Sequence, residues 1–122
     1  MTAYLLAEVK WHDLAMRDEY VAKIGSTLEL HGGRIINLPS VEPLALEGEW
    51  NPLRLVIIEF ATMDALKGWY DSQEYAQLKR LREHGSRSNL VAVEGRPVDR
   101  VTEAAPKATP ESPEAPAPTP NP

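Results

Sequence analysis

Residues 53–60, which read Leu-Arg-Leu-Val-Ile-Ile-Glu-Phe, constrain the fold more than any other part of the chain. Alternate side chains of a β-strand point to opposite sides of its sheet. One face of this strand then carries Leu53, Leu55, Ile57 and Glu59, and the other carries Arg54, Val56, Ile58 and Phe60. Because both faces are mainly apolar, we expect both to be covered.

Residues 4–10 form a second expected strand with the same two-sided pattern. Leu5, Ala7 and Val9 share one face, and the other face carries Tyr4, Leu6, Glu8 and Lys10.

An amphipathic helix is expected over residues 13–31. Asp13 suits its N-cap, because an aspartate side chain accepts a hydrogen bond from the first free amide groups. The apolar stripe of this helix recurs every three or four residues and consists of Met16, Tyr20, Ile24, Leu28 and His31. Gly32 and Gly33 follow, and glycine readily takes the left-handed conformation that ends a helix.

Residues 34–38 are a candidate edge strand that Pro39 interrupts. We expect the strand to resume over residues 41–47 after a bulge, since proline is tolerated at sheet edges. Residues 47–52 then form a turn.

A second helix is expected to begin at Thr62 or Met63 and to break at Asp71 and Ser72. Its first part buries Leu66, Trp69 and Tyr70. Ser72 caps a second part that ends at Gly85 and carries on one face Tyr75, Leu78 and Arg82. Residues 90–94 are the last strand.

The expected order is therefore β-α-β-β-α-β, an α+β fold of the ferredoxin-like kind. Right-handed connections place both helices on one face of a four-stranded antiparallel sheet. The opposite face stays bare and apolar, and exposed patches of that kind mark interfaces. We therefore expect a homodimer that forms through the sheet face.

Composition separates a domain from a tail. Eight of the eleven prolines lie in residues 97–122, which have almost no large apolar side chains. We expect residues 1–95 to fold as one domain and residues 96–122 to form a disordered, proline-rich tail. Its loose P-x-x-P pattern is either a partner-binding segment or a solubilising spacer.

Charge and composition also limit the partners. The net charge is −5 and no basic patch stands out, so nucleic acid is not an expected partner. No segment is long and apolar enough for a membrane span or a signal peptide, and the chain has no cysteine. A cytoplasmic location is the expectation.

Several short motifs in a fixed order resemble domain-of-unknown-function family 1330 (DUF1330) of the dimeric alpha-beta barrel superfamily. The resemblance covers residues 3–95 and rests on 31–34 (His-Gly-Gly-Arg), 47–50 (Glu-Gly-Glu-Trp) with Pro52 and Arg54, Glu59 and Phe60, Trp69 and Tyr70, Ser72, Glu74 and Tyr75, Arg82, and 93–95 (Val-Glu-Gly). It implies a ferredoxin-like subunit that packs on a partner's sheet, often with a pocket between sheet and helices. It implies no single activity, because related branches include monooxygenases, lactone isomerases and haem enzymes.

The expected topology brings His31, Tyr4, Glu59 and Glu94 to the same end of the domain. Glu59 and His31 are candidate acid-base catalysts, because burial raises a carboxyl pKa and histidine titrates near neutrality. The alternative for His31 is a contact with the carbonyl groups that end its helix. The alternative for Glu59 is an ion pair with Arg34 or a hydrogen bond to a tyrosine.

Aromatic and basic side chains supply the candidate ligand contacts, which are Tyr4, Trp50, Arg54, Trp69, Tyr75 and Arg82. The aromatic residues either line a pocket or belong to the core. Trp50, in a turn, either caps that pocket or fills the dimer interface. Arg54 and Arg82 either favour a ligand with a carboxylate or pair with local glutamates.

No metal site, cofactor motif or nucleophile motif is recognisable in the sequence. The favoured function is the binding of a small organic metabolite, acidic or aromatic. The alternatives are a cofactor-independent enzyme of the isomerase, lactone hydrolase or monooxygenase type, which would use Glu59 and His31, and a structural dimer that displays proline-rich tails.

Overall fold

Four strands and three helices make up the part of the chain that the computed structural model describes, residues 1–97. In chain order they are β1 (Ala3–Trp11), α1 (Leu14–Glu29), β2 (Arg34–Ile35), β3 (Leu55–Phe60), α2 (Met63–Tyr70), α3 (Gln73–Gly85) and β4 (Ser86–Glu94). The strands form one antiparallel sheet in the order β2-β3-β1-β4. This confirms the expected ferredoxin-like α+β fold.

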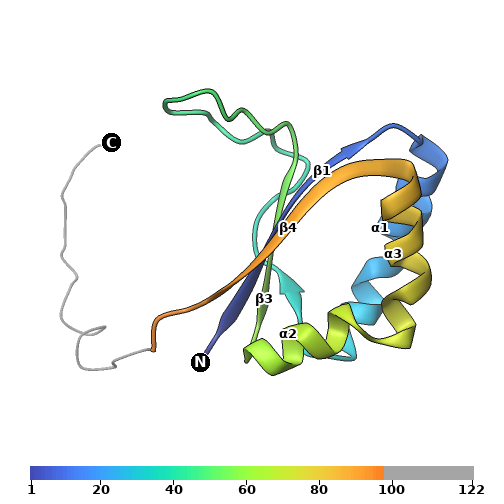
Figure 1. Ribbon diagram of the computed structural model, residues 1–122, viewed down its shortest axis with the longest axis vertical. Coiled ribbons are helices and arrows are strands. Elements are labelled where there is room, and N and C mark those ends of the chain that lie inside the picture. Colours follow the sequence, from blue (N-terminus) through green and yellow to red (C-terminus); the bar gives the residue numbers. More distant parts are fainter. Residues whose placement is uncertain (98–122) are drawn as a thin grey trace.

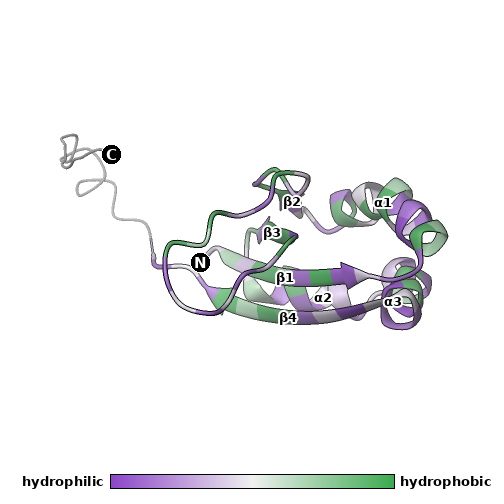
Figure 2. Cartoon of the chain, turned by 90° about the horizontal axis from the view of Figure 1, so that it is seen from above, coloured by the Kyte–Doolittle hydropathy of each residue, from purple (hydrophilic) through white to green (hydrophobic). Residues whose placement is uncertain are grey.

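All three helices lie on one side of the sheet, as Figure 1 shows. The register sets which side chains they cover, because Leu5 of β1 lies opposite Ile58 of β3 and Ala92 of β4. Along β1 every second residue from Ala3 to Val9 is buried, while the residues between them are half-buried or exposed. The resulting alternation in hydropathy is visible along β1 in Figure 2.

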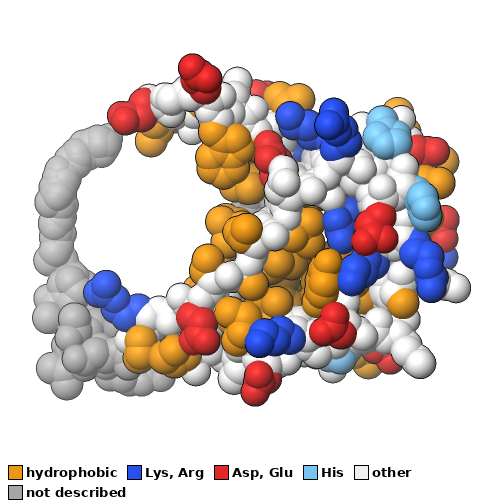
Figure 3. Space-filling view, in the orientation of Figure 1, with side chains coloured by type: hydrophobic (Ala, Val, Ile, Leu, Met, Phe, Trp, Pro, Cys, Tyr) orange, Lys and Arg blue, Asp and Glu red, His pale blue; other side chains and the backbone are white. Residues whose placement is uncertain are grey.

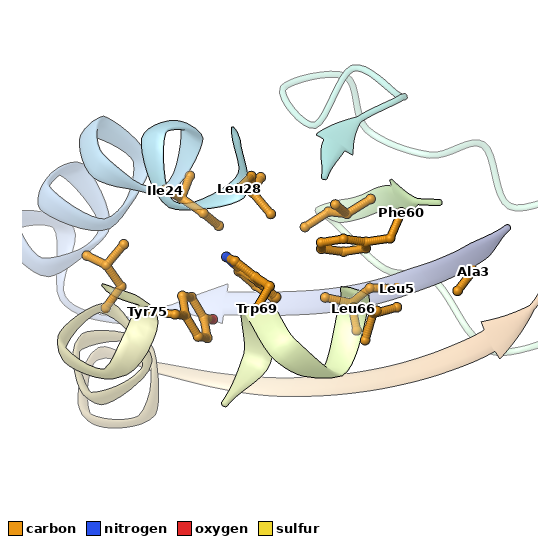
Figure 4. Packing of buried hydrophobic residues seen from close by; sticks show 10 residues of the cluster. Ala3, Leu5, Ile24, Leu28, Phe60, Leu66, Trp69 and Tyr75 are labelled. Atoms are coloured by element: carbon orange, nitrogen blue, oxygen red, sulfur yellow. The ribbon is translucent and has the colours of Figure 1, made fainter. Parts of the chain in front are cut away.

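The core lies between the sheet and the helices (Figure 4). Trp69 of α2 stands in its centre, fully buried, and its ring centroid lies 4.0 Å from that of Tyr75 of α3. The other buried members of the cluster are Ala3, Leu5, Ile24, Leu28, Ile58, Phe60, Leu66 and Leu78. Burial of this apolar surface is the main force that holds helices and sheet together.

Each helix begins after a side-chain N-cap at a position that the sequence predicted. Asp13 Oδ1 accepts a hydrogen bond of 3.0 Å from the amide of Met16, and Ser72 Oγ accepts one of 3.2 Å from the amide of Tyr75. The expected break between α2 and α3 is confirmed. After α1, Gly32 has a φ of +73°, a conformation that glycine adopts without strain.

Several expected boundaries were wrong: the helix expected to reach His31 ends at Glu29, the strand expected over 34–38 is limited to Arg34–Ile35, and the strand expected over 53–60 begins at Leu55. Residues 41–47 form no strand; they belong to a long connection from β2 to β3 that projects from the body of the domain (Figure 1). Pro39 and Pro43 lack amide donors, and several apolar side chains of this connection stay exposed, for example Leu44 and Leu46. The last strand begins at Ser86 rather than at residue 90, directly after α3.

None of the helices within residues 1–97 has the length and hydropathy needed to cross a membrane. The prediction of a disordered tail falls on residues 96–122, nearly all of which lie outside the described part.

Candidate functional site

A cavity of about 330 Å³ lies between the sheet and α1. Strands β1 and β3 supply one wall through alternate side chains, and α1 and α2 supply the other. The lining residues are Leu5, Ala7, Val9, Trp11, Tyr20, Val21, Ile24, Gly25, Ile35, Pro39, Ser40, Arg54, Val56, Ile58, Trp69 and Leu90. Most of these side chains are apolar, and the volume lies at the lower end of the range of about 300–1,000 Å³ that is typical of ligand sites.

Few polar groups face this cavity. The indole Nε1 of Trp69 donates a hydrogen bond of 3.0 Å to Thr27 Oγ1 and is therefore already satisfied. Arg54 lies just before β3, and within residues 1–97 no carboxylate lies at ion-pair distance from it. Its guanidinium is thus a cation that remains available to an acidic ligand.

A chain of hydroxyl groups runs from the cavity wall to a buried arginine. The hydroxyl oxygens of Tyr20 and Tyr75 lie 2.6 Å apart. Arg82 Nε donates to the Tyr75 hydroxyl at 3.2 Å, and Arg82 Nη1 donates to Ser88 Oγ at 2.6 Å. Burial, and next the neighbouring Tyr75, raise the pKa of Tyr20 far above its ordinary value, so this phenol stays protonated.

His31 lies outside the cavity. Its Nε2 is 3.3 Å from Glu74 Oε1 of α3, in an ion pair when the imidazole is protonated. The hydrogen bond from His31 lowers the pKa of the Glu74 carboxyl. This contact ties the end of α1 to the start of α3.

Glu59 points to the side of the sheet that has no helices. Its Oε1 accepts from Arg34 Nε at 2.8 Å and lies 2.7 Å from Arg34 Nη2, which is the ion pair that the sequence offered as an alternative. Tyr4 lies beside Glu59 in the register of β1 and β3. The structure therefore places the two candidate catalysts in different environments, each with a partner of its own.

The remaining candidates lie in three different places. Trp69 and Arg54 line the cavity, whereas Tyr75 and Arg82 are buried behind its wall. Trp50 lies elsewhere: 61% of it is exposed, and its Nε1 donates to Glu8 Oε2 at 3.3 Å on the side without helices. Tyr20 was missed as a site residue, although its place in the apolar stripe of α1 signalled that it faces the sheet.

The sheet face without helices, which we call the open face, carries many apolar side chains. They come from three strands and are Tyr4, Leu6, Leu55, Ile57, Val91 and Val93. In Figure 3 hydrophobic side chains gather over the strands on the side away from α1 and α3. Val91 is 58% exposed and Val93 45% exposed, although both belong to a strand.

Within the described residues, no group of three histidine, aspartate or glutamate side chains is placed to hold a metal ion.

Solved structures of other proteins share this fold. An RPA0582 protein of unknown function from Rhodopseudomonas palustris superposes with a TM-score of 0.64 at 15% identity, over 80% of this chain and 84% of that one. SnoaB, described as a cofactor-independent oxygenase from Streptomyces nogalater, gives a TM-score of 0.56 at 12% identity, over 80% of this chain and 95% of that one. The molecule thus shares the ferredoxin-like α+β fold of these structures, and identities this low show the fold alone.

The family follows from the sequence model for the domain of unknown function DUF1330, which matches residues 2–96. The chain belongs to this family. No curated protein matches the sequence significantly.

Proposed function

We propose that the cavity binds a small, mainly apolar organic molecule that has a flat ring and an acidic group. The cavity itself is the observation that carries this proposal, because small-molecule sites are concave, mostly apolar clefts of about 300–1,000 Å³. The space of about 330 Å³ between sheet and α1 has this size and this apolar lining.

The wall chemistry supports a flat ligand. Trp11 and Tyr20 lie along a cavity whose other lining residues are mostly aliphatic, and the fully buried Trp69 forms part of its base. Aromatic rings pack on one another in offset or edge-to-face arrangements and add to the free energy of apolar burial. A ring system is therefore the ligand shape that gains most from these walls.

Arg54 supports an acidic group on that ligand. It lines the cavity and has no carboxylate partner within the described residues. Because guanidinium groups pair with carboxylates in a planar, two-bond geometry, Arg54 favours a carboxylate at its end of the ligand.

A titration with 2-naphthoate tests the proposal on the full-length protein. We expect binding of one molecule per chain, with a change in tryptophan fluorescence because Trp11 and Trp69 line the cavity. Ala7→Phe fills the cavity from the centre of β1 and is expected to lower the affinity at least tenfold. Ala92→Phe is the control, because Ala92 of β4 lies beside Leu5 on the same face of the sheet as Ala7 but outside the cavity.

The role of Arg54 has a test of its own. Arg54→Gln is expected to lower the affinity for 2-naphthoate about fivefold, since partly exposed ion pairs contribute up to about 1 kcal/mol. The affinity for the uncharged 2-naphthylmethanol stays the same. Equal binding of 2-naphthoate by wild type and Ala7→Phe would contradict the proposal.

We further propose that a second copy of the chain covers the open face. The support is the contiguous apolar surface of three strands, which includes Leu6, Ile57 and Val91 and lies beside the indole of Trp50. Contiguous exposed apolar patches on soluble proteins mark interaction sites. A sheet face packs well on another sheet face, because the side chains of both interdigitate.

A further inference from the structure

The hydroxyl groups of Tyr20 and Tyr75 and the guanidinium of Arg82 form a chain of hydrogen bonds behind the cavity. The donor and the acceptor are fixed at the Arg82 end of this chain. Arg82 is 5% exposed and keeps its charge, and a guanidinium has donors but no acceptor. The hydrogen bond of 3.2 Å between Arg82 Nε and Tyr75 is therefore donated by Arg82. The Tyr75 oxygen is an acceptor in this bond, and its own proton must find another partner.

Only one described group can take the proton of Tyr75. Tyr75 is fully buried, so water does not reach its hydroxyl, and a buried donor without a partner is costly. Within residues 1–97, the Tyr20 oxygen at 2.6 Å is the remaining hydrogen-bond partner of this hydroxyl. Tyr75 therefore donates to Tyr20.

This direction leaves the proton of Tyr20 without a protein acceptor. Arg82, the other polar neighbour of the Tyr20 hydroxyl, has donors only, and no second acceptor for the Tyr20 proton lies within residues 1–97; Tyr20 also lines the cavity. Tyr20 does not lose this proton near neutral pH, because burial raises its pKa well above the ordinary value.

We infer that Tyr20 donates its hydroxyl proton to a carbonyl-type oxygen of the cavity ligand, and so selects ketones, aldehydes, esters or quinones over hydrocarbons of the same shape. The inference rests on the proposed function, since it concerns the same cavity. It adds an uncharged acceptor to the ligand chemistry that Arg54 already favours.

The guanidinium of Arg82 makes the Tyr20 hydroxyl a stronger hydrogen-bond donor. Hydrogen bonds in series polarise one another, and a charged donor makes the first bond stronger than a neutral one. Arg82 therefore polarises Tyr75, and Tyr75 polarises Tyr20. A carbonyl oxygen, which carries partial negative charge, gains more from such a donor than from an isolated phenol.

A matched pair of probes tests this inference on the full-length protein. Acetophenone and ethylbenzene have nearly the same shape, but only acetophenone carries a carbonyl oxygen. Their affinities are measured by NMR titration for wild type, Tyr20→Phe and the control Tyr4→Phe, whose ring lies on the open face. We expect Tyr20→Phe to lower the affinity for acetophenone about three- to tenfold and to leave the affinity for ethylbenzene unchanged. Tyr4→Phe is expected to change neither affinity.

Ethylbenzene also reports that the Tyr20→Phe variant keeps its fold and its cavity. An infrared measurement adds a readout that loss of packing would not give, because the carbonyl stretch of bound acetophenone is expected at lower frequency in wild type than in Tyr20→Phe. If the ratio of the affinities for acetophenone and ethylbenzene is the same in wild type and Tyr20→Phe, the inference is wrong, whereas the proposed function still holds. Failure of both probes to bind wild type would overturn the two together.

Discussion

Gly33 shows, at the scale of a single residue, how closely the connection between α1 and β2 approaches Phe60 of β3. A Cβ atom at this position would lie 2.5 Å from Phe60 Cε1 and 3.1 Å from Leu28 Cδ2. Phe60 is fully buried, so its ring has little room to move away. The glycine is thus required by close approach, whereas its neighbour Gly32 is required by its φ.

Gly33→Ala is therefore expected to destabilise the domain by about 1–3 kcal/mol, the usual cost of overpacking a core. Gly25→Ala is the contrasting change, because a Cβ there meets nothing within 4 Å and the residue lies inside α1. It should raise the free energy of unfolding by about 0.5–1 kcal/mol through helix propensity. Urea unfolding of both variants measures the difference, and similar stability of the two would refute the packing argument.

For Tyr20, the sequence predicts the position on the helix but not the hydrogen bond of the side chain. Its place on the inner stripe of α1 follows from helical spacing, but its hydroxyl meets Tyr75, a residue 55 positions away in sequence. No local pattern encodes that contact, so the hydroxyl chain appears only in the fold. Glu59 is different, because the unfavourable charge on an apolar strand already predicted a partner, and Arg34 was one of those named.

At the scale of elements, strong periodicity predicted β1, β3 and all three helices. The strand predicted over residues 41–47 is absent for a physical reason. The apolar residues of this connection suggest a strand, but on that side β3 pairs with only Arg34 and Ile35. Residues without a pairing partner gain nothing from the extended conformation. Pairing is a property of two segments, and one segment's sequence does not reveal it.

The break between α2 and α3 gives a prediction at this scale. Ser72 Oγ accepts from the amide of Tyr75 and begins the helix that carries both Tyr75 and Arg82. Ser72→Ala is expected to lower the free energy of unfolding by about 1 kcal/mol, the typical value of an N-cap. Ser26→Ala, an exposed position inside α1, is the control and should be close to neutral. Equal stability of the two variants in thermal unfolding would show that the Ser72 cap does not stabilise the domain.

At the scale of the whole molecule, the two faces of the sheet have different roles. The helix side forms the cavity, and the open face presents apolar side chains to solvent in a single chain. We propose that pairing of two copies through the open face completes the molecule. The two-sided apolar pattern of residues 53–60 predicts the same pairing.

Val91→Lys tests this pairing. Val91 is 58% exposed in the single chain, so a lysine there leaves the subunit fold intact while it places a charge in the proposed interface. Sedimentation analysis should give twice the chain mass of 13.6 kDa for wild type and the single mass for the variant. Leu30→Lys, at the end of α1 and 68% exposed, should remain a dimer. A wild-type monomer would refute the interface.

The central claim concerns where a small molecule binds, and backbone amide chemical shifts recorded during titration with 2-naphthoate test it most directly. The account predicts the largest changes around the cavity, at Gly25, Val56 and Trp69, with the indole signals of Trp11 and Trp69 also moving. The same titration would contradict the account if the changes were confined to the open face around Leu6, Ile57 and Val93, or if no signal moved.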